Sequence, residues 1–134
     1  MADNTFSLQI ICPDRVFYEG EVKMLELNTI EGEVGIYKDH MPMTMIIAPG
    51  VLQIRESDDT VKMAALHSGF VEVLPEKITV LAEVAEWPDE IDLNRAQEAK
   101  ERAQKRLDTK DSGTDMARAQ TALMRAIARI HAVK

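Results

Sequence analysis

The sequence changes character at residues 86–92, EWPDEID. All five prolines and five of the six glycines lie at or before Pro88, whereas nine of the fifteen alanines fall in the last 39 residues. Glycine and proline interrupt regular structure, and alanine is the strongest helix former. The sequence therefore predicts two parts: turn-rich chain over residues 1–87, followed by helical chain over residues 88–134.

Residues 1–87 contain short apolar segments separated by turn-forming residues. In residues 6–12, FSLQIIC, Phe6, Leu8, Ile10 and Cys12 alternate with other side chains, which is the period of a half-buried strand. Pairs such as Pro49-Gly50 and Ser68-Gly69 are suited to reversing the chain. Many short strands at this spacing predict a β-sandwich or flattened barrel. We expect its core to be mainly aliphatic and to contain the three phenylalanines, Phe6, Phe17 and Phe70. The further expected strands are residues 22–27, 43–47, 51–55, 61–66, 70–74 and 78–84.

Residues 88–134 predict an antiparallel two-helix hairpin, so the fold class is α+β in two parts. Asp92 is expected to cap the first helix, and Asp115 restarts the apolar pattern after the break at residues 108–114. Alanine-rich stripes bury little area for each residue, so we expect the hairpin to be weakly held and movable. The expected stripes are Leu93, Ala96, Ala99, Ala103 and Leu107, and Met116, Ala119, Leu123, Ala126, Ile127 and Ile130.

Six arginines in the hairpin follow one spacing twice. Two interpretations are open. They form a solvated charged face with intrahelical pairs such as Glu98 with Arg102, or they bind a polyphosphate, whose oxygens match guanidinium forks and which the start of a helix also favours. No glycine-rich phosphate loop is present, so hydrolysis of such a ligand is not expected. The two trios are Arg95, Arg102 and Arg106, and Arg118, Arg125 and Arg129.

Composition excludes several classes of function. Residues 1–88 carry six basic and fifteen acidic side chains (−9), and residues 89–134 carry ten and eight (+2), giving −7 overall. This balance argues against a nucleic-acid ligand. No apolar run approaches the ~20 residues of a membrane helix, and we expect no export signal at the start. Cys12 and the His67-Ser68 pair lack partners for catalysis, and no metal-ligand spacing is present, so we expect neither a catalytic nor a metal site.

Four short motifs occur in a fixed order. They are residues 31–37 (EGEVGIY), 39–42 (DHMP), 49–50 (PG) and 68–70 (SGF). In order and separation they resemble the epsilon subunit of F-type ATP synthases, in its short bacterial form. The resemblance extends over nearly the whole chain, including the hairpin.

The resemblance implies a non-catalytic rotor subunit of the central stalk. The sandwich would bind the gamma subunit and rest on the c ring, with Glu33 and His40 facing the c-ring loops from a glycine-bearing connection. The hairpin would take alternative positions, reach the catalytic alpha/beta head and regulate ATP hydrolysis. The protein would be peripheral, at the cytoplasmic face of the bacterial cell membrane, and would meet the membrane only through the complex. The alternative from the residues alone is a free-standing adaptor whose hairpin binds a partner helix.

A subset of the family binds ATP through a motif that residues 91–96, IDLNRA, match. ATP would be a regulatory ligand, and no catalytic cofactor is implied. Asp92 would either cap its helix or accept from the adenine amino group, and both roles are open. The nucleotide-binding residues that the resemblance implies are Glu86, Ile91, Asp92, Arg95, Ala96, Arg102, Arg125 and Arg129.

Overall fold

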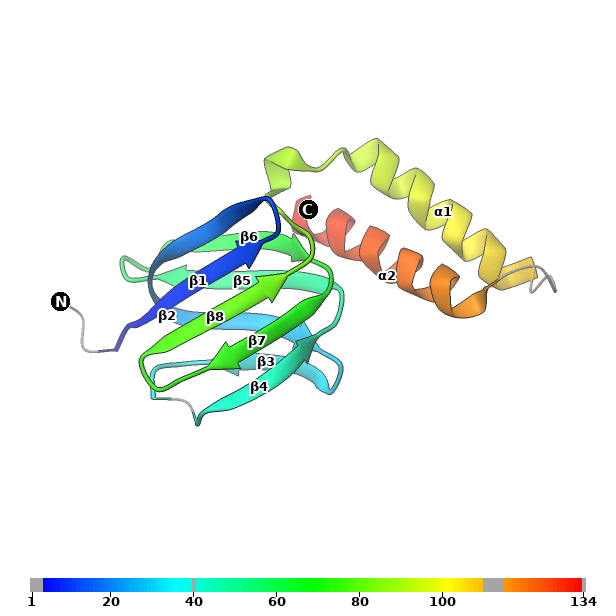
Figure 1. Ribbon diagram of the computed structural model, residues 1–134. Coiled ribbons are helices and arrows are strands. Elements are labelled where there is room, and N and C mark those ends of the chain that lie inside the picture. Colours follow the sequence, from blue (N-terminus) through cyan, green and yellow to red (C-terminus); the bar gives the residue numbers. More distant parts are fainter. Residues whose placement is uncertain (1–3, 40, 110–114, 134) are drawn as a thin grey trace.

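The computed structural model describes residues 4–39, 41–109 and 115–133. Within these residues a strand-rich part is followed by a helical hairpin, as the sequence predicts (Figure 1). The strands are β1 (Phe6–Cys12), β2 (Arg15–Thr29), β3 (Gly32–Ile36), β4 (Met43–Ile47), β5 (Gly50–Glu56), β6 (Val61–Leu66), β7 (Gly69–Val73), β8 (Lys77–Ala82) and β9 (Ala85–Glu86). The helices are η1 (Pro88–Glu90), a short 3₁₀ helix, α1 (Leu93–Thr109) and α2 (Met116–Val133).

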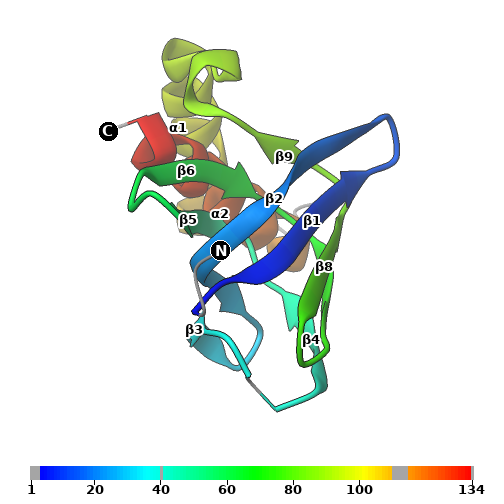
Figure 2. The same ribbon diagram turned by 90° about the vertical axis from the view of Figure 1, so that its left-hand side faces the viewer.

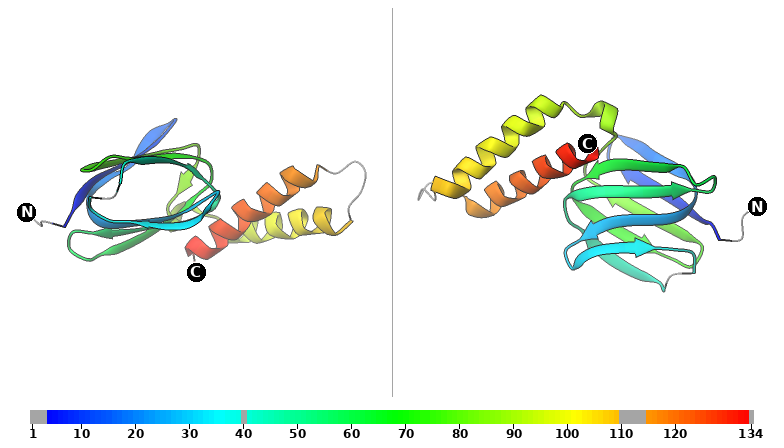
Figure 3. Two further views of the ribbon diagram at one scale, coloured as in Figure 1. Left: turned by 90° about the horizontal axis from the view of Figure 1, so that it is seen from below. Right: turned by 180° about the vertical axis from the view of Figure 1, so that it is seen from behind.

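The strands close into a flattened barrel of two layers. β1 pairs antiparallel with β2 and parallel with β8, and β8, β7 and β4 follow as antiparallel neighbours. The pair Thr29–Ile47 joins β4 back to β2, so the ring is complete, as Figure 3 shows from below. β2 also pairs with β3 and β5. β6 pairs with β5 and β9 pairs with β6, so these two strands extend the layer that contains β2, β3 and β5. The two layers lie on opposite sides of β1 and β2 in Figure 2, which confirms the sandwich prediction.

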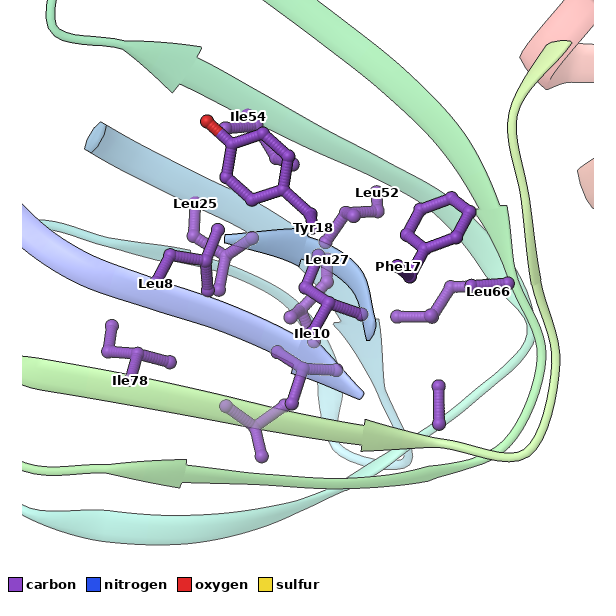
Figure 4. Close-up of a cluster of buried hydrophobic side chains, with 14 of the residues drawn as sticks. Leu8, Ile10, Phe17, Tyr18, Leu25, Leu27, Leu52, Ile54, Leu66 and Ile78 are labelled. Atoms are coloured by element: carbon purple, nitrogen blue, oxygen red, sulfur yellow. The ribbon is translucent and has the colours of Figure 1, made fainter. Parts of the chain in front are cut away.

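The core between the layers is mainly aliphatic. Leu8, Ile10, Leu25 and Leu52 are among the side chains with no solvent exposure, and Figure 4 shows them meeting from different strands. Removing apolar surface from water contributes about 25 cal/mol per Å², so this cluster is the main source of stability of the strand-rich part.

One core expectation is wrong: Phe70 is 43% exposed. Strand alternation directs its neighbours Val71 and Val73 into the core, which turns Phe70 to the outer face of β7. There it lies opposite Ile46 of β4, which is 55% exposed. An apolar side chain in a short strand does not by itself reveal which face it occupies.

The prediction missed the first half of β2, all of β3, and β9. The segment around Glu33, expected to be a connection, is in fact strand β3, paired with β2. Thr29 makes the hairpin turn, because its hydroxyl donates to the Gly32 carbonyl at 2.8 Å and accepts from the Glu31 amide at 3.2 Å. Gly32 has φ of +123°, a conformation that glycine adopts readily.

An aspartate caps each helix of the hairpin: Asp92, as the sequence predicts, and Asp115, for which the sequence predicts only that the apolar pattern restarts there. Asp92 accepts the Arg95 amide and Asp115 accepts the Arg118 amide, each at 3.1 Å. α1 continues through Thr109, two residues further than expected, and the remaining break at residues 110–114, which includes Lys110, lies outside the described residues.

The hairpin projects from one end of the sandwich, and the end of α2 lies against it (Figure 1). Ala96 and Ala103 of α1 are buried, as are Ala119 and Ala126 of α2. Ala128 and Ala132 are buried as well, although the predicted stripe omits them. α2 contacts β5 and β6 in addition to α1, so it needs a second face of small residues.

The linker between the two parts is fixed to the sandwich. The Trp87 ring stacks on Phe17 with 4.2 Å between ring centroids. Arg15 forms two hydrogen bonds with the Glu90 carboxylate, both at 2.8 Å, and Glu90 also accepts the Trp87 amide at 2.9 Å. The linker therefore follows the sandwich as far as Glu90.

We expect a fragment of residues 1–90 to unfold cooperatively, because its core cluster contains no side chain from α1 or α2. A fragment of residues 1–87 should fold with a lower midpoint, since it lacks the Glu90 carboxylate. Thermal unfolding followed by circular dichroism, with amide NMR spectra of both fragments, measures this. A collapsed state without amide dispersion in both fragments would show that the two-part division is wrong.

Candidate functional site

A pocket of about 360 Å³ lies between the linker and the hairpin. This linker pocket contains seven of the eight nucleotide-binding residues that the sequence implies. Ligand pockets typically start near 300 Å³, so the space suits a small molecule. The seven are Glu86, Ile91, Asp92, Arg95, Ala96, Arg102 and Arg129, and Glu90 and Ala99 complete the lining.

Arg125 lies outside the linker pocket. With Arg106 and Arg118 it lines a second pocket, of about 840 Å³, towards the far end of the hairpin. Arg102 and Arg106 lie one turn apart on α1, and Arg125 and Arg129 lie one turn apart on α2, so the two pockets follow each other along one side of the hairpin. The Arg125 Nε atom is buried and has no hydrogen-bond partner among the described residues.

Glu86 connects the sandwich to α2. Its Oε1 atom accepts from His67 Nε2 at 3.0 Å and from Arg129 Nε at 2.7 Å. The hydrogen bond from His67, followed by that from Arg129, holds the pKa of Glu86 below its usual value although burial opposes this. An ionised carboxylate only accepts, so Nε2 of His67 is the donor in this pair.

Sequence reasoning missed Glu90 and Ala99 of the pocket lining, and it missed His67, which contacts Glu86 from the sandwich. His67 is 1% exposed, and its Nδ1 atom has no partner among the described residues. Its position in the sequence, at the end of a strand and before Ser68, carries no sign of Glu86, which lies 19 residues away. Two residues after His67, Gly69 has φ of +141°, and a Cβ there would collide with the Leu81 carbonyl oxygen. The turn that follows His67 therefore requires glycine.

The guanidinium groups of the hairpin are mostly without acidic partners. Of its six arginines, all in the described part of the chain, Arg129 alone forms an ion pair. Glu98 and Arg102, both described, do not form the intrahelical pair that the sequence allows. Unpaired guanidiniums are strong donors for phosphate and carboxylate oxygens, so the side of the hairpin that carries both pockets is suited to an anion.

Asp92 has the capping role that the sequence allows. Its Oδ1 atom accepts the Arg95 amide, and the residue also lines the linker pocket. A cap uses one oxygen of the carboxylate, so a second hydrogen bond to a ligand is compatible with it.

Glu33 lies apart from the linker pocket. Glu33 is exposed on β3 and lines a third pocket, of about 410 Å³, with Ile127 and His131 of α2. A hydrogen bond with Glu33 raises the pKa of Glu26 on the neighbouring strand. His40 lies outside the described residues. Among the residues that the structure describes, no group of three or more His, Cys, Asp or Glu side chains could hold a metal ion, and no helix has the length and apolar character needed to cross a membrane.

Comparison with known proteins covers both parts of the chain. The family model of the ATP synthase delta/epsilon chain beta-sandwich domain matches residues 5–88, and that of its long alpha-helix domain matches residues 89–134. The ATP synthase epsilon chain of Caldanaerobacter subterraneus subsp. tengcongensis is 46% identical over 129 residues, which cover 96% of this chain and 93% of that protein. The chain belongs to the ATP synthase epsilon family. The epsilon chain of Syntrophomonas wolfei is 45% identical over 132 residues, 98% of this chain and 96% of the relative.

Solved structures show the same fold. A chain in the Euglena gracilis mitochondrial ATP synthase (OSCP/F1/c-ring) superposes with a TM-score of 0.83 at 20% identity, covering 97% of this chain and 82% of that one. A chain in the central stalk/c-ring structure of the Tetrahymena thermophila enzyme gives a TM-score of 0.62 at 14% identity, covering 96% of each. The two-part fold is therefore shared with these chains, and the family models and the curated relatives show that this chain is an ATP synthase epsilon subunit.

Replacing Glu86 with Gln should lower the free energy of unfolding at pH 7 by about 1 to 3 kcal/mol, because the neutral amide oxygen accepts from Arg129 and His67 without the charge of the carboxylate. The pKa of Glu86 is lower in the folded protein than in the unfolded chain. The stability that ionised Glu86 contributes is therefore fully present at a pH above the pKa of the unfolded chain, and it is lost as the pH falls through the pKa of the folded protein. The difference in free energy of unfolding between the original chain and Glu86→Gln should therefore shrink below about pH 4. Urea unfolding across the acid range measures it.

The matched control is Glu72→Gln, an exposed carboxylate on β7 without an ion pair in the described structure. It should leave the free energy of unfolding nearly unchanged. Equal effects of the two substitutions would contradict the joining role of Glu86.

Proposed function

We propose that this chain is a non-catalytic rotor subunit of the central stalk that links the gamma subunit to the c ring and regulates ATP hydrolysis by the alpha/beta head. Family membership over both parts supports this interpretation over a free-standing adaptor. The similar Tetrahymena chain belongs to a structure of the central stalk and c ring, which supports the same location. The subunit would be peripheral, at the cytoplasmic face of a bacterial cell membrane, and would meet the lipid only through the complex.

The regulatory ligand that we propose is ATP, bound in the linker pocket. The observation that carries this is the convergence of seven implied residues, from β9, the linker, α1 and α2, on one pocket. Ile91 and Ala96 offer an apolar surface for the base beside the Asp92 carboxylate, and Arg95, Arg102 and Arg129 offer donors for phosphate. Arg125 would meet the end of the phosphate chain, where its buried Nε lacks a partner in the described structure.

ATP would favour the folded hairpin over any extended position. The linker pocket is lined by the linker, α1 and α2 together, so it exists only while these segments are packed as described. A ligand shifts a population only through a difference in affinity between states, and a site built from three segments provides one. Since no glycine-rich phosphate loop is present, the bound ATP would act as a signal and not as a substrate.

The isolated chain should bind ATP, and Arg95→Ala or Arg129→Ala should weaken binding about tenfold or more, because each removes charge-assisted hydrogen bonds worth about 1.5 to 3 kcal/mol. Isothermal titration calorimetry measures both. Lys100→Ala is the matched control, since Lys100 carries the same charge as the two arginines and lies on the same helix as Arg95 but does not line the linker pocket. Equal affinities of the arginine and lysine variants would contradict ATP binding by these arginines and favour the other interpretation, a solvated charged face.

Deleting residues 91–134 should raise ATP hydrolysis by the assembled enzyme at low ATP, because the hairpin that restrains the head is absent. The deletion keeps Glu90 and hence the Arg15 contact of the linker. At high ATP the intact enzyme should approach the rate of the truncated one. An unchanged rate at both concentrations would remove the inhibitory role.

Glu33 and His40 are the proposed contacts with the c ring. Glu33 is exposed, as this role requires. Replacing both with Ala should weaken the coupling of proton flow to ATP turnover, measured in membrane vesicles, while Glu72→Ala should not. Normal coupling in the double variant, with normal retention of the subunit, would argue against this contact.

A further inference from the structure

The charges that line the linker pocket cancel. Three side chains are acidic, Glu86, Glu90 and Asp92, and three are basic, Arg95, Arg102 and Arg129. A pocket without net charge attracts an anion poorly, because each uncompensated carboxylate repels it at short range. The affinity for a phosphate-bearing ligand therefore depends on how each carboxylate is neutralised.

Each of the three carboxylates accepts at least one hydrogen bond, and Glu90 accepts the Trp87 amide at 2.9 Å, but among the described residues only Glu86 has an ion pair with another residue of the pocket lining. Glu86 is paired with Arg129 and accepts from His67, and Asp92 accepts the amide at the start of α1. Glu90 has no ion pair with any lining residue of the pocket in the described structure. Its partner comes from the opposite side of the linker.

That partner is Arg15, at the start of β2. Arg15 Nη1 lies 2.8 Å from Glu90 Oε2, and Arg15 Nη2 lies 2.8 Å from Glu90 Oε1, so the pair is bidentate. Arg15 Nη2 also donates to the Ala85 carbonyl at 3.2 Å. Glu90 lines both the linker pocket and a pocket on the side of Arg15, whereas Arg15 lines only the latter.

We propose that Arg15 is a positioning residue of the linker pocket, which neutralises Glu90 from outside and so allows the pocket to accept an anion. The inference rests on the proposed function and extends it by one residue of the sandwich. It is consistent with the ionisation of Glu90, whose pKa the hydrogen bonds from Arg15 lower to about 2. Glu90 is charged at neutral pH and does not escape repulsion by taking up a proton.

The competing explanation is that Arg15 only holds the linker against the sandwich and does not act through its charge. The two explanations predict different effects of removing one or both partners of the Arg15–Glu90 pair. If Arg15 only held the linker in place, removing either partner or both would disturb the pocket in the same way. If Arg15 acts through charge, removing both partners restores the original balance. A lysine at position 15 preserves the charge but not the bidentate geometry, so it separates the two explanations again.

The test is calorimetric titration of the full chain with ATP and, separately, with inorganic tripolyphosphate, at low and at moderate salt. Arg15→Gln should bind both about two- to fivefold more weakly at low salt, the size expected of an exposed charge pair, and salt should reduce the difference. Arg15→Lys should bind within twofold of the original chain. Glu90→Gln should bind at least as tightly, and Arg15→Gln/Glu90→Gln should regain the loss. Lys77→Gln, at the start of β8, controls for general charge.

Three results would overturn the proposal: an unchanged affinity of Arg15→Gln, a double variant as weak as Arg15→Gln, or Arg15→Lys as weak as Arg15→Gln. Thermal unfolding of each variant checks that the loss is not one of folding. An original chain that binds tripolyphosphate but not ATP would contradict the proposed function alone, and the tripolyphosphate series would still decide the role of Arg15. A chain that binds neither would contradict both.

Discussion

The contact on which the arrangement of the two parts depends is the Glu86 carboxylate. One of its oxygens accepts from His67, which is buried in the sandwich, and from Arg129, which is near the end of the last helix. If Glu86 were lost, the buried Nε2 proton of His67 would have no acceptor and Arg129 would have no ion pair in the described structure. The carboxylate therefore fixes where the end of α2 meets the sandwich, and with it the shape of the linker pocket.

Apolar packing alone holds the hairpin only weakly. The buried residues of both helices are alanines, each of which removes little surface from water. Such an interface is specific in shape and low in energy, so a few charged contacts make up a large share of the free energy of docking. A ligand that interacts with Arg129 and its neighbours then acts on the same scale as the interface itself.

Local patterns in the sequence predict local structure well. The segments 43–47 and 61–66 are strands with the expected bounds, and Asp92 caps its helix. The sequence does not predict β3, because Gly32 and Gly35 indicate a loop. The segment is a strand because it pairs with β2, and single-residue propensities do not encode that pairing. The candidate site divides in the same way. Residues 91–96 are contiguous and are found from their motif, and the family resemblance also implies Glu86 and Arg129. The hydrogen bond between Glu86 and Arg129 was not predicted, because these residues are 43 positions apart and meet only where the hairpin folds back. Contacts of this kind follow from topology, which periodicity does not encode.

Trp87 is the only tryptophan of the chain, and it lies between Glu86 and the 3₁₀ helix that leads to the hairpin. Its ring stacks on Phe17 and has Lys62 above it, with Lys62 Nζ 6.0 Å from the ring centroid. Indole emission depends on stacking and on nearby charge, and the one indole of the chain lies at the junction of its two parts. Movement of the hairpin that disturbs the linker would change that emission without any attached label, whereas a hinge beyond Glu90 would leave it constant, which makes the natural sequence a reporter of where the chain bends.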